Sequence, residues 1–105
     1  MPPRYELIYA EETYRHLVAI ERQYHSLIRQ TIEQQLLYEP NVRTCNRKLL
    51  VKPARFGEAW ELRFGPDNRF HVFYRFDDQV NHVRVLAIAD KRGEKLYVGG
   101  KELVP

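Results

Sequence analysis

Residues 60–76 read Trp60-Glu-Leu-Arg-Phe-Gly-Pro-Asp-Asn-Arg-Phe-His-Val-Phe-Tyr-Arg-Phe76. Apolar and polar side chains alternate on both sides of a run of turn formers, Gly65-Pro66-Asp67-Asn68, which predicts two β-strands joined by a short turn. Successive side chains of a strand point to opposite faces. The predicted apolar face holds Trp60, Leu62, Phe64, Phe70, Val72, Tyr74 and Phe76, and the other face holds Glu61, Arg63, Arg69, His71, Phe73 and Arg75. A surface with several guanidiniums, a carboxylate and an imidazole suits a polyanion.

On the N-terminal side of this hairpin, the pattern predicts a strand followed by helix. Residues 4–9 alternate between apolar and polar side chains, as a short strand does. Residues 11–38 place apolar side chains at helical spacing and contain no Gly or Pro, and Pro40 ends the run. They are predicted to form one long helix or two helices in a hairpin, and the polar stretch 21–25 is the best place for a turn.

The remaining segments predict further strands. Residues 41–57 are the least regular part, with Leu49-Leu50-Val51 as an anchor or a short strand. After the hairpin, a third strand is expected at 82–89, a polar turn at 90–94 and a short last strand at 95–98. Sequential strands joined by short turns favour an antiparallel meander.

Together these elements predict an α+β fold in a single domain spanning residues 1–105. We expect an antiparallel β-sheet of about four strands, packed on one face by an N-terminal α-helical hairpin. The apolar stripe of the helices would be buried on the apolar face of the hairpin, which includes Trp60. The charged face of the sheet is then expected to stay open to solvent.

Composition fits one small domain and adds an asymmetry of charge. The chain has 105 residues, of which 44% are hydrophobic and 30% charged, as in ordinary globular proteins. Residues 1–40 hold four basic and six acidic side chains, whereas residues 41–105 hold thirteen and eight. The C-terminal part, which is predicted to be sheet, is therefore the basic part. This indicates a partner that is nucleic acid or an acidic protein.

Several classes of protein are disfavoured. The single Cys45 excludes an intramolecular disulfide, and without a Cys/His ligand spacing a structural zinc site is not expected. The N-terminus lacks the charged and then apolar regions of a signal peptide. No apolar stretch approaches the roughly 20 residues that span a membrane. We therefore expect a cytoplasmic protein.

Four strings carry a resemblance that covers nearly the whole chain: Trp60-Glu-Leu-Arg-Phe64, Asn68-Arg-Phe-His-Val-Phe-Tyr74, Val83-Arg-Val-Leu-Ala-Ile88, and Lys91-Arg92 followed by Leu96-Tyr97. They resemble the RelE/ParE superfamily, the toxin halves of bacterial type II toxin–antitoxin modules. The helical segment ending at Pro40 and the stretch Asn46-Arg-Lys-Leu49 also fit. RelE-like members cut mRNA in the ribosomal A site, whereas ParE-like members poison DNA gyrase and have no known nuclease role.

The resemblance also implies a set of catalytic residues. RelE-like nucleases place basic residues on the first hairpin strand, an Arg on the second, an Arg after the following strand and a Tyr near the C-terminus. Here these are Arg63, Arg69, Arg92 and Tyr97, and Tyr97 would stack on a base or orient the substrate. Glu61 departs from the pattern, since a RelE-type site has a second basic residue there. Glu61 would either act as a general base, as in some relatives, or mark an altered site.

The chemistry of RNA cleavage assigns roles to these side chains. The 2′-OH attacks the adjacent phosphate in line, expels the 5′-oxygen and leaves a 2′,3′-cyclic phosphate. The protein must orient this geometry, neutralise the phosphate oxygens and move protons. Arg69 is the leading candidate to bind the phosphate, Arg63 is the second side chain expected to bind it, and Arg92 would lie near the leaving oxygen. Either Glu61, whose pKa would have to be raised, or His71 would accept the 2′-OH proton. No metal or other cofactor is expected.

Partners follow from the same resemblance. Arg47, Lys48 and Lys91 are expected to contact RNA, the ribosome or an antitoxin rather than to take part in chemistry. The natural partner would be an acidic antitoxin, with an extended or helical segment on the basic face. Because the antitoxin usually binds the DNA, this chain alone is not expected to bind a specific DNA sequence.

Two alternatives to a ribosome-dependent endoribonuclease remain. One is a ParE-like inhibitor of DNA gyrase without nuclease activity. The other is a degenerate member that only binds its antitoxin, because Glu61 has ended catalysis.

Overall fold

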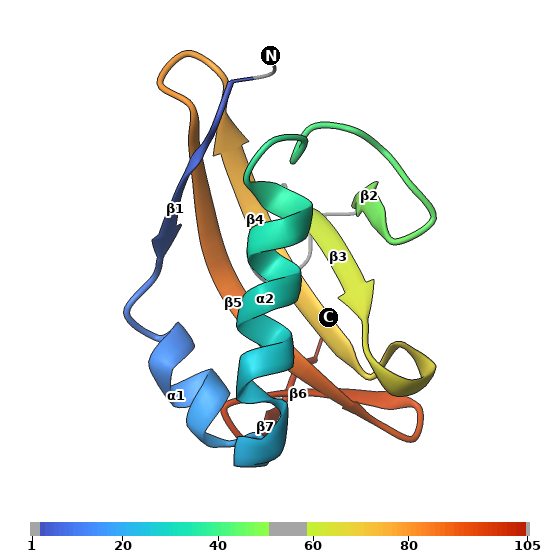
Figure 1. Cartoon of the computed structure of the whole chain (residues 1–105). Helices are drawn as coiled ribbons and strands as arrows, with labels where there is room; N and C mark the ends of the chain where they lie inside the picture. The colour runs from blue at the N-terminus through green and yellow to red at the C-terminus, as the bar shows by residue number, and fades with distance from the viewer. Residues whose placement is uncertain (1–2, 51–58, 105) are drawn as a thin grey trace.

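The computed structural model describes residues 3–50 and 59–104 and shows an α+β fold with one helix laid across a sheet (Figure 1). The strands are β1 Glu6–Tyr9, β2 Arg47–Leu49, β3 Trp60–Phe64, β4 Phe70–Asp77, β5 His82–Arg92, β6 Lys95–Val98 and β7 Lys101–Glu102. The α-helices are α1 Thr13–Val18 and α2 His25–Leu36, and two short 3-10 helices are η1 Arg22–Tyr24 and η2 Pro66–Asn68. Part of the predicted strand at Leu49-Leu50-Val51 lies outside the described residues.

The sheet is larger than predicted and is not wholly antiparallel. Within the described ranges it has seven strands, in the order β2-β3-β4-β5-β6-β7, and β1 pairs in parallel with β5. One edge of β5 is shared, since β1 pairs with residues 82–85 and β6 pairs with residues 89–92. The expected number of about four strands was too low because β2 and β7 have only three and two residues. Such short runs carry almost no alternation. The expectation of a purely antiparallel sheet was wrong because β1 pairs in parallel with β5.

The predicted hairpin is confirmed. Trp60 pairs with Tyr74, Leu62 with Val72 and Phe64 with Phe70, so these side chains share one face of β3 and β4. The turn begins at Gly65, which has a φ of 85° and a ψ of −176°. A Cβ atom there would lie 2.6 Å from the Phe70 Cδ2 atom. The turn therefore requires glycine, both for its backbone angles and for the space that it leaves.

The helical region is interrupted where the sequence is most polar. α1 ends at Val18, η1 follows, and α2 begins at His25, so one continuous helix is excluded. The imidazole Nε2 of His25 lies 2.8 Å from the carbonyl oxygen of Ile20, across this break. α1 is only six residues long and packs against β5, where the Ile88 N–H donates to His16. The predicted helical hairpin is therefore a short helix beside a single long one. In the described residues, no helix is long and apolar enough to cross a membrane.

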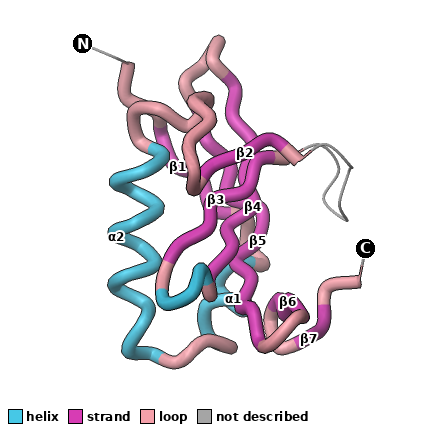
Figure 2. The backbone as a smooth tube through the Cα atoms, turned by 90° about the vertical axis from the view of Figure 1, so that its right-hand side faces the viewer, coloured by secondary structure: helices cyan, strands magenta, loops and turns pink. Residues whose placement is uncertain are grey.

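The main hydrophobic core lies between α2 and one face of the sheet (Figure 2). From α2 it receives Ile28, Ile32 and Leu36, and from the sheet Leu62, Phe70, Val72, Tyr74, Val83 and Val85, all fully buried. The spacing of the three helix residues places them on one side of α2, as an amphipathic helix requires. Trp60, predicted as core, is only partly buried and packs against Phe76 at the margin of the hydrophobic core.

The opposite face of the sheet is not open, which corrects the prediction of a solvated charged face. A second hydrophobic cluster is buried there, and β6 and β7 lie on this side, away from α2 (Figure 2). It consists of Phe73, Ala87 and Ala89, packed against Leu50, Leu96, Val98 and Leu103. The C-terminal hairpin thus covers part of this face, which the alternation of polar and apolar residues in β3 and β4 alone could not indicate.

Candidate functional site

The structure divides the predicted site residues between the two faces of the sheet. Glu61, Arg63, His71 and Lys48 gather on the face away from α2, and we call them the second-face cluster. Arg69 and Arg92 lie instead on the α2 side with Asp90 and Glu21, and we call these four the sheet-end cluster. Tyr97 pairs with Asp90 across β5 and β6, and so belongs to the same side as the sheet-end cluster.

A buried carboxylate and imidazole form the centre of the second-face cluster. The Nδ1 atom of His71 lies 3.0 Å from the Oε2 atom of Glu61, and both residues are buried. Two cations flank the other carboxylate oxygen, because Lys48 Nζ and Arg63 Nε each lie 3.9 Å from Glu61 Oε1. The cluster therefore carries two permanent positive charges against one negative charge.

The electrostatics of this cluster fix the tautomer of His71. Burial of Glu61 disfavours its ionised form, but the hydrogen bond from His71 and the charges of His71, Lys48 and Arg63 outweigh burial and lower the pKa of Glu61. An ionised Glu61 can only accept, so Nδ1 of His71 carries a hydrogen in either protonation state, and Nε2 carries the lone pair whenever the ring is neutral. The Nε2 atom is buried and has no hydrogen-bond partner among the described residues. Because its pKa is lowered, Glu61 fits the role of partner to His71 better than that of general base.

Arg69 is the centre of the sheet-end cluster. Its Nε and Nη2 atoms donate to the two carboxylate oxygens of Asp90 at 2.6 and 3.1 Å, and Nη2 also donates to Glu21 Oε1 at 2.8 Å. The guanidinium lies over the rings of Tyr24 and Phe70, 5.0 and 5.2 Å from their centroids. The hydrogen bonds to Asp90 and then to Glu21 raise the pKa of Arg69 further above its usual range. Two carboxylates thus already neutralise this guanidinium.

The position of Arg69 corrects the predicted face. Arg69 precedes β4 and has helical backbone angles, φ −59° and ψ −36°, so the alternation of the strand does not extend to it. Its partner Asp90 lies opposite Phe70, on the core side, because β5 continues to Arg92 through the residues predicted as a turn. Ile88 faces the core, so continuing the alternation of β5 to the next residue on that face would have placed Asp90 on the core side as well. No sequence signal links Arg69 to Glu21, which lies 48 residues away.

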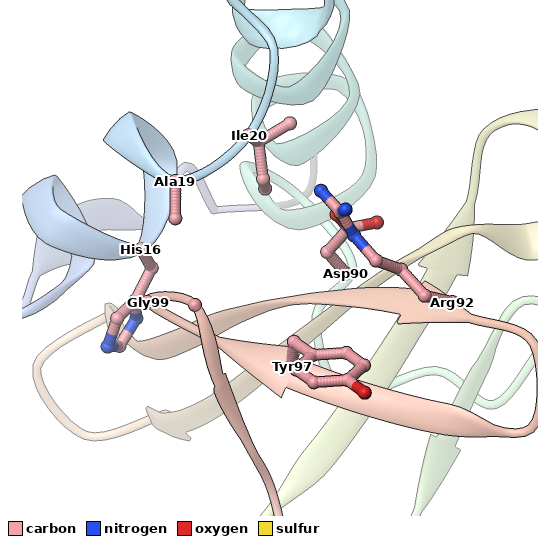
Figure 3. A pocket seen from close by; sticks show the side chains of 8 residues that line it. His16, Ala19, Ile20, Asp90, Arg92, Tyr97 and Gly99 are labelled. Atoms are coloured by element: carbon pink, nitrogen blue, oxygen red, sulfur yellow. The ribbon is translucent and has the colours of Figure 1, made fainter.

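Arg92 completes the sheet-end cluster and borders a pocket. Its Nε atom donates to Asp90 Oδ2 at 3.1 Å, and its Nη2 atom lies 3.6 Å from Glu21 Oε1. Beside it is a pocket of about 340 Å³. The pocket is lined by His16, Ala19, Ile20, Asp90, Arg92, Tyr97, Gly99 and Gly100 (Figure 3). Arg92 and Tyr97 thus border one pocket, whereas Glu61 lies on the opposite face of the sheet.

His16 is a pocket residue that sequence analysis did not identify. Its Nδ1 atom accepts a hydrogen bond of 3.3 Å from the backbone N–H of Ile88. Burial lowers the pKa of His16 and so favours the neutral ring. The nearby charge of Glu12 has a smaller effect in the opposite direction. Because Nδ1 accepts, the ring hydrogen lies on Nε2. His16 lies on a short helix with no motif around it, so only the packing of α1 on β5 reveals it.

The predicted RNA- or ribosome-binding residues differ in exposure. Arg47 is buried, and its guanidinium donates to the carbonyl oxygens of Gln35 in the last turn of α2, at 2.8 Å, and of Glu39 in the segment after α2. This corrects the expectation that Arg47 contacts RNA, because its side chain instead joins β2 to the end of α2. Lys48 and Lys91 are exposed, as a binding role requires. Among residues 3–50 and 59–104, no group of three His, Cys, Asp or Glu side chains is placed to hold a metal ion.

Comparisons with known proteins give one informative result. No protein-family model matches the sequence. No curated protein is significantly similar to it. Among solved structures, the chain is similar to a chain of the RelBE2 toxin–antitoxin complex from Mycobacterium tuberculosis, with a TM-score of 0.69 and 18% sequence identity over 85% of this chain and 93% of that chain. Identity this low shows a shared fold rather than a shared activity. The protein therefore has a RelE-like fold.

Proposed function

We propose that this protein is the toxin of a type II toxin–antitoxin module and that it cuts mRNA on the ribosome. The observation that supports a nuclease best is the buried Glu61–His71 pair, in which Nε2 of His71 has no partner among the described residues and two cations flank Glu61. The fold supports the class of protein, because it is shared with a chain of a toxin–antitoxin complex. The pair supports the chemistry, because an imidazole oriented by a carboxylate is a common general base.

In the proposed reaction the RNA supplies its own nucleophile. Nε2 of His71 takes the proton of the 2′-OH, the 2′-oxygen bonds to phosphorus, and the bond from phosphorus to the 5′-oxygen breaks. The 5′-oxygen takes a proton from solvent, which leaves a 2′,3′-cyclic phosphate and a 5′-OH. Arg63 and Lys48 stabilise the charge on the phosphate oxygens. Glu61 keeps the imidazole in the required tautomer and stabilises the imidazolium that forms.

The sheet-end cluster has a binding role in this proposal. Arg69 and Arg92 would hold a phosphate of the same strand, and Tyr97 would stack on a base. Single-stranded RNA is flexible enough to pass from one face of the sheet to the other around the end where β3 and β4 turn. Lys91, exposed near that end, would add to the electrostatic attraction.

Dependence on the ribosome has two physical reasons. A basic surface of this size binds free RNA weakly and without sequence preference. In addition, the Nε2 atom of His71 is buried in the free protein, so side chains over it must move before RNA can reach it. Contacts with the ribosome would supply the free energy for that movement. The partner in the resting cell would be an acidic antitoxin that covers the basic surface.

Primer extension on mRNA held in programmed ribosomes tests the proposal. We expect cleavage by the native protein only when ribosomes are present, and a loss of about 100-fold or more for His71→Gln, which cannot accept the proton. Arg69→Ala should also lower cleavage, because it removes a guanidinium that binds a phosphate of the RNA.

The matched control is His82→Gln. His82 also pairs with a glutamate, with its Nε2 atom 3.2 Å from Glu6 Oε2, but both side chains are exposed at the other end of the sheet. This variant should cleave like the native protein. Cleavage that survives His71→Gln would remove His71 from the mechanism. Absence of cleavage from a folded protein that still halts growth would sink the nuclease proposal.

The pairing of Arg69 favours a second candidate function. A guanidinium already held by Asp90 and Glu21 is less available for a phosphate. That arrangement fits a protein that acts by binding alone, either as a ParE-like inhibitor of DNA gyrase or as a degenerate member that only binds an antitoxin. A gyrase supercoiling assay separates the two, because only the first would inhibit the enzyme.

A further inference from the structure

One oxygen atom of Glu21 occupies the position that an anion would take between two arginines. Glu21 Oε1 lies 2.8 Å from Arg69 Nη2 and 3.6 Å from Arg92 Nη2. These two arginines come from the β3–β4 turn and the end of β5, whereas Glu21 comes from the break between the helices. Two guanidinium groups that converge on one oxygen form the arrangement with which arginines bind a phosphate.

The two carboxylates of the sheet-end cluster differ in how easily they can leave. Asp90 has a side chain that is 6% exposed, and it binds both Arg69 and Arg92 from beneath. The side chain of Glu21 is 47% exposed, and the residue stands outside regular helix, at the N-cap of η1. An exposed ion pair of this kind contributes little to stability. Asp90 therefore fixes the two guanidiniums in place, while Glu21 can be exchanged for another anion at small cost.

The pocket next to Arg92 has the size and lining for one nucleoside. Its volume of about 340 Å³ is at the lower end of the range for small-molecule sites. Tyr97 offers a ring for stacking, and Ala19 and Ile20 offer apolar contact (Figure 3). His16 offers a hydrogen-bond donor, because its Nδ1 atom is already an acceptor for Ile88 N–H. A phosphate at the position of Glu21 would thus have a cavity for its own nucleoside beside it.

We propose that Glu21 occupies an RNA phosphodiester site in the free protein, and that RNA binds between Arg69 and Arg92 by displacing this carboxylate. The nucleoside attached to that phosphate enters the pocket lined by Tyr97 and His16. Glu21 is then an internal competitor that lowers the affinity for free RNA. This inference rests on the proposed function for the identity of the anion. An acidic segment of a protein partner is the competing occupant, but the adjoining nucleoside-sized pocket favours RNA.

Equilibrium binding of a labelled single-stranded RNA hexamer, followed by fluorescence anisotropy at fixed low salt, tests the inference without cleavage. We expect Glu21→Gln to lower Kd roughly three- to fivefold, the effect of removing one partly exposed ion pair. The control is Glu39→Gln, which removes the same charge from an exposed glutamate 4.0 Å from Arg47. In the Glu21→Gln background, Arg92→Gln should abolish the gain in affinity.

The outcomes separate this inference from the proposed function. Equal changes in Kd for Glu21→Gln and Glu39→Gln would overturn the inference, because the gain would then be general electrostatics. Tighter binding of a poly-glutamate peptide by Glu21→Gln, without tighter RNA binding, would overturn it in favour of a protein partner. If RNA binding tightens as expected but no variant cleaves mRNA on ribosomes, the nuclease proposal fails and the RNA site remains. Thermal unfolding followed by circular dichroism confirms that each variant is folded.

Discussion

At the residue scale, burial distinguishes two glutamate–histidine pairs of the same chemistry. Glu61 and His71 are buried on the second face, whereas Glu6 and His82 form an exposed pair between β1 and β5. Only the buried pair has a nitrogen atom shielded from water without a partner. Alternation along β3 and β4 was enough to predict that Glu61 and His71 share a face, because their spacing is set by a short turn. It could not predict their burial, which depends partly on segments elsewhere in the chain.

The lowered pKa of Glu61 predicts how stability changes with pH. A carboxylate whose pKa in the folded protein is below its unfolded value of 4.5 contributes stability above that pH, and the contribution is lost as pH falls through the folded pKa. Glu61→Gln should therefore lower the free energy of unfolding at pH 7 by about 1–3 kcal/mol and weaken its dependence on pH in acid. Urea unfolding between pH 3 and pH 7, followed by the fluorescence of Trp60, measures both. Glu6→Gln, in the exposed pair, should have almost no effect, and an equal loss in both variants would contradict this account.

At the element scale, the elements that depend on local sequence patterns could be predicted, whereas those that depend on pairing with distant segments could not. The hairpin of β3 and β4 was predictable because its turn, its alternation and its register all lie within residues 60–76. The break before α2 also fell in the polar stretch 21–25. By contrast, β5 extends to Arg92, because pairing with β6 carries the strand through residues that look like a turn. That extension brings Asp90 to Arg69, so an error of a few residues in one strand hid the central ion pair of the sheet end.

Two glycines in turns provide an element-scale prediction. Gly65 and Gly93 both have positive φ, 85° and 64°. A Cβ atom at Gly65 would lie 2.6 Å from Phe70, whereas a Cβ atom at Gly93 would meet no atom of the described residues within 4 Å. Gly93→Ala should cost about 1 kcal/mol, from backbone strain alone. Gly65→Ala should cost at least about 2 kcal/mol more, because fully buried Phe70 cannot move away. Chemical denaturation of both variants tests the difference, and equal losses would show that contact with Phe70 does not matter.

At the scale of the whole molecule, one sheet carries a hydrophobic cluster on each face. α2 covers one face, and the C-terminal hairpin of β6 and β7 covers part of the other. β4 and β5 contribute side chains to both clusters, since Tyr74 faces α2 while Phe73 faces away from it. Because the two clusters share these strands, we expect them to unfold together.

Ile32→Ala tests this coupling. Ile32 lies on α2 and is fully buried, so the substitution should lower the free energy of unfolding by about 2–5 kcal/mol. The loss should appear as one transition that coincides in far-ultraviolet circular dichroism and in Trp60 fluorescence. Leu27→Ala, on the same helix but at a side chain that is 41% exposed, should cost less than about 1 kcal/mol. Two separate transitions would show that the clusters are independent.

The class of fold and the central hairpin could be predicted from the sequence alone, and the sequence also supplied candidate site residues. These features depend on alternation, helical spacing and turn formers, which act over a few residues and so can be read from a linear chain. Only the tertiary structure decided that Arg69 faces Asp90 and Glu21, that His16 lines a pocket with Tyr97, and that Arg47 is buried. Each of these depends on contacts between segments that lie far apart in the chain, where pairing and packing choose the neighbours and no local pattern records the choice.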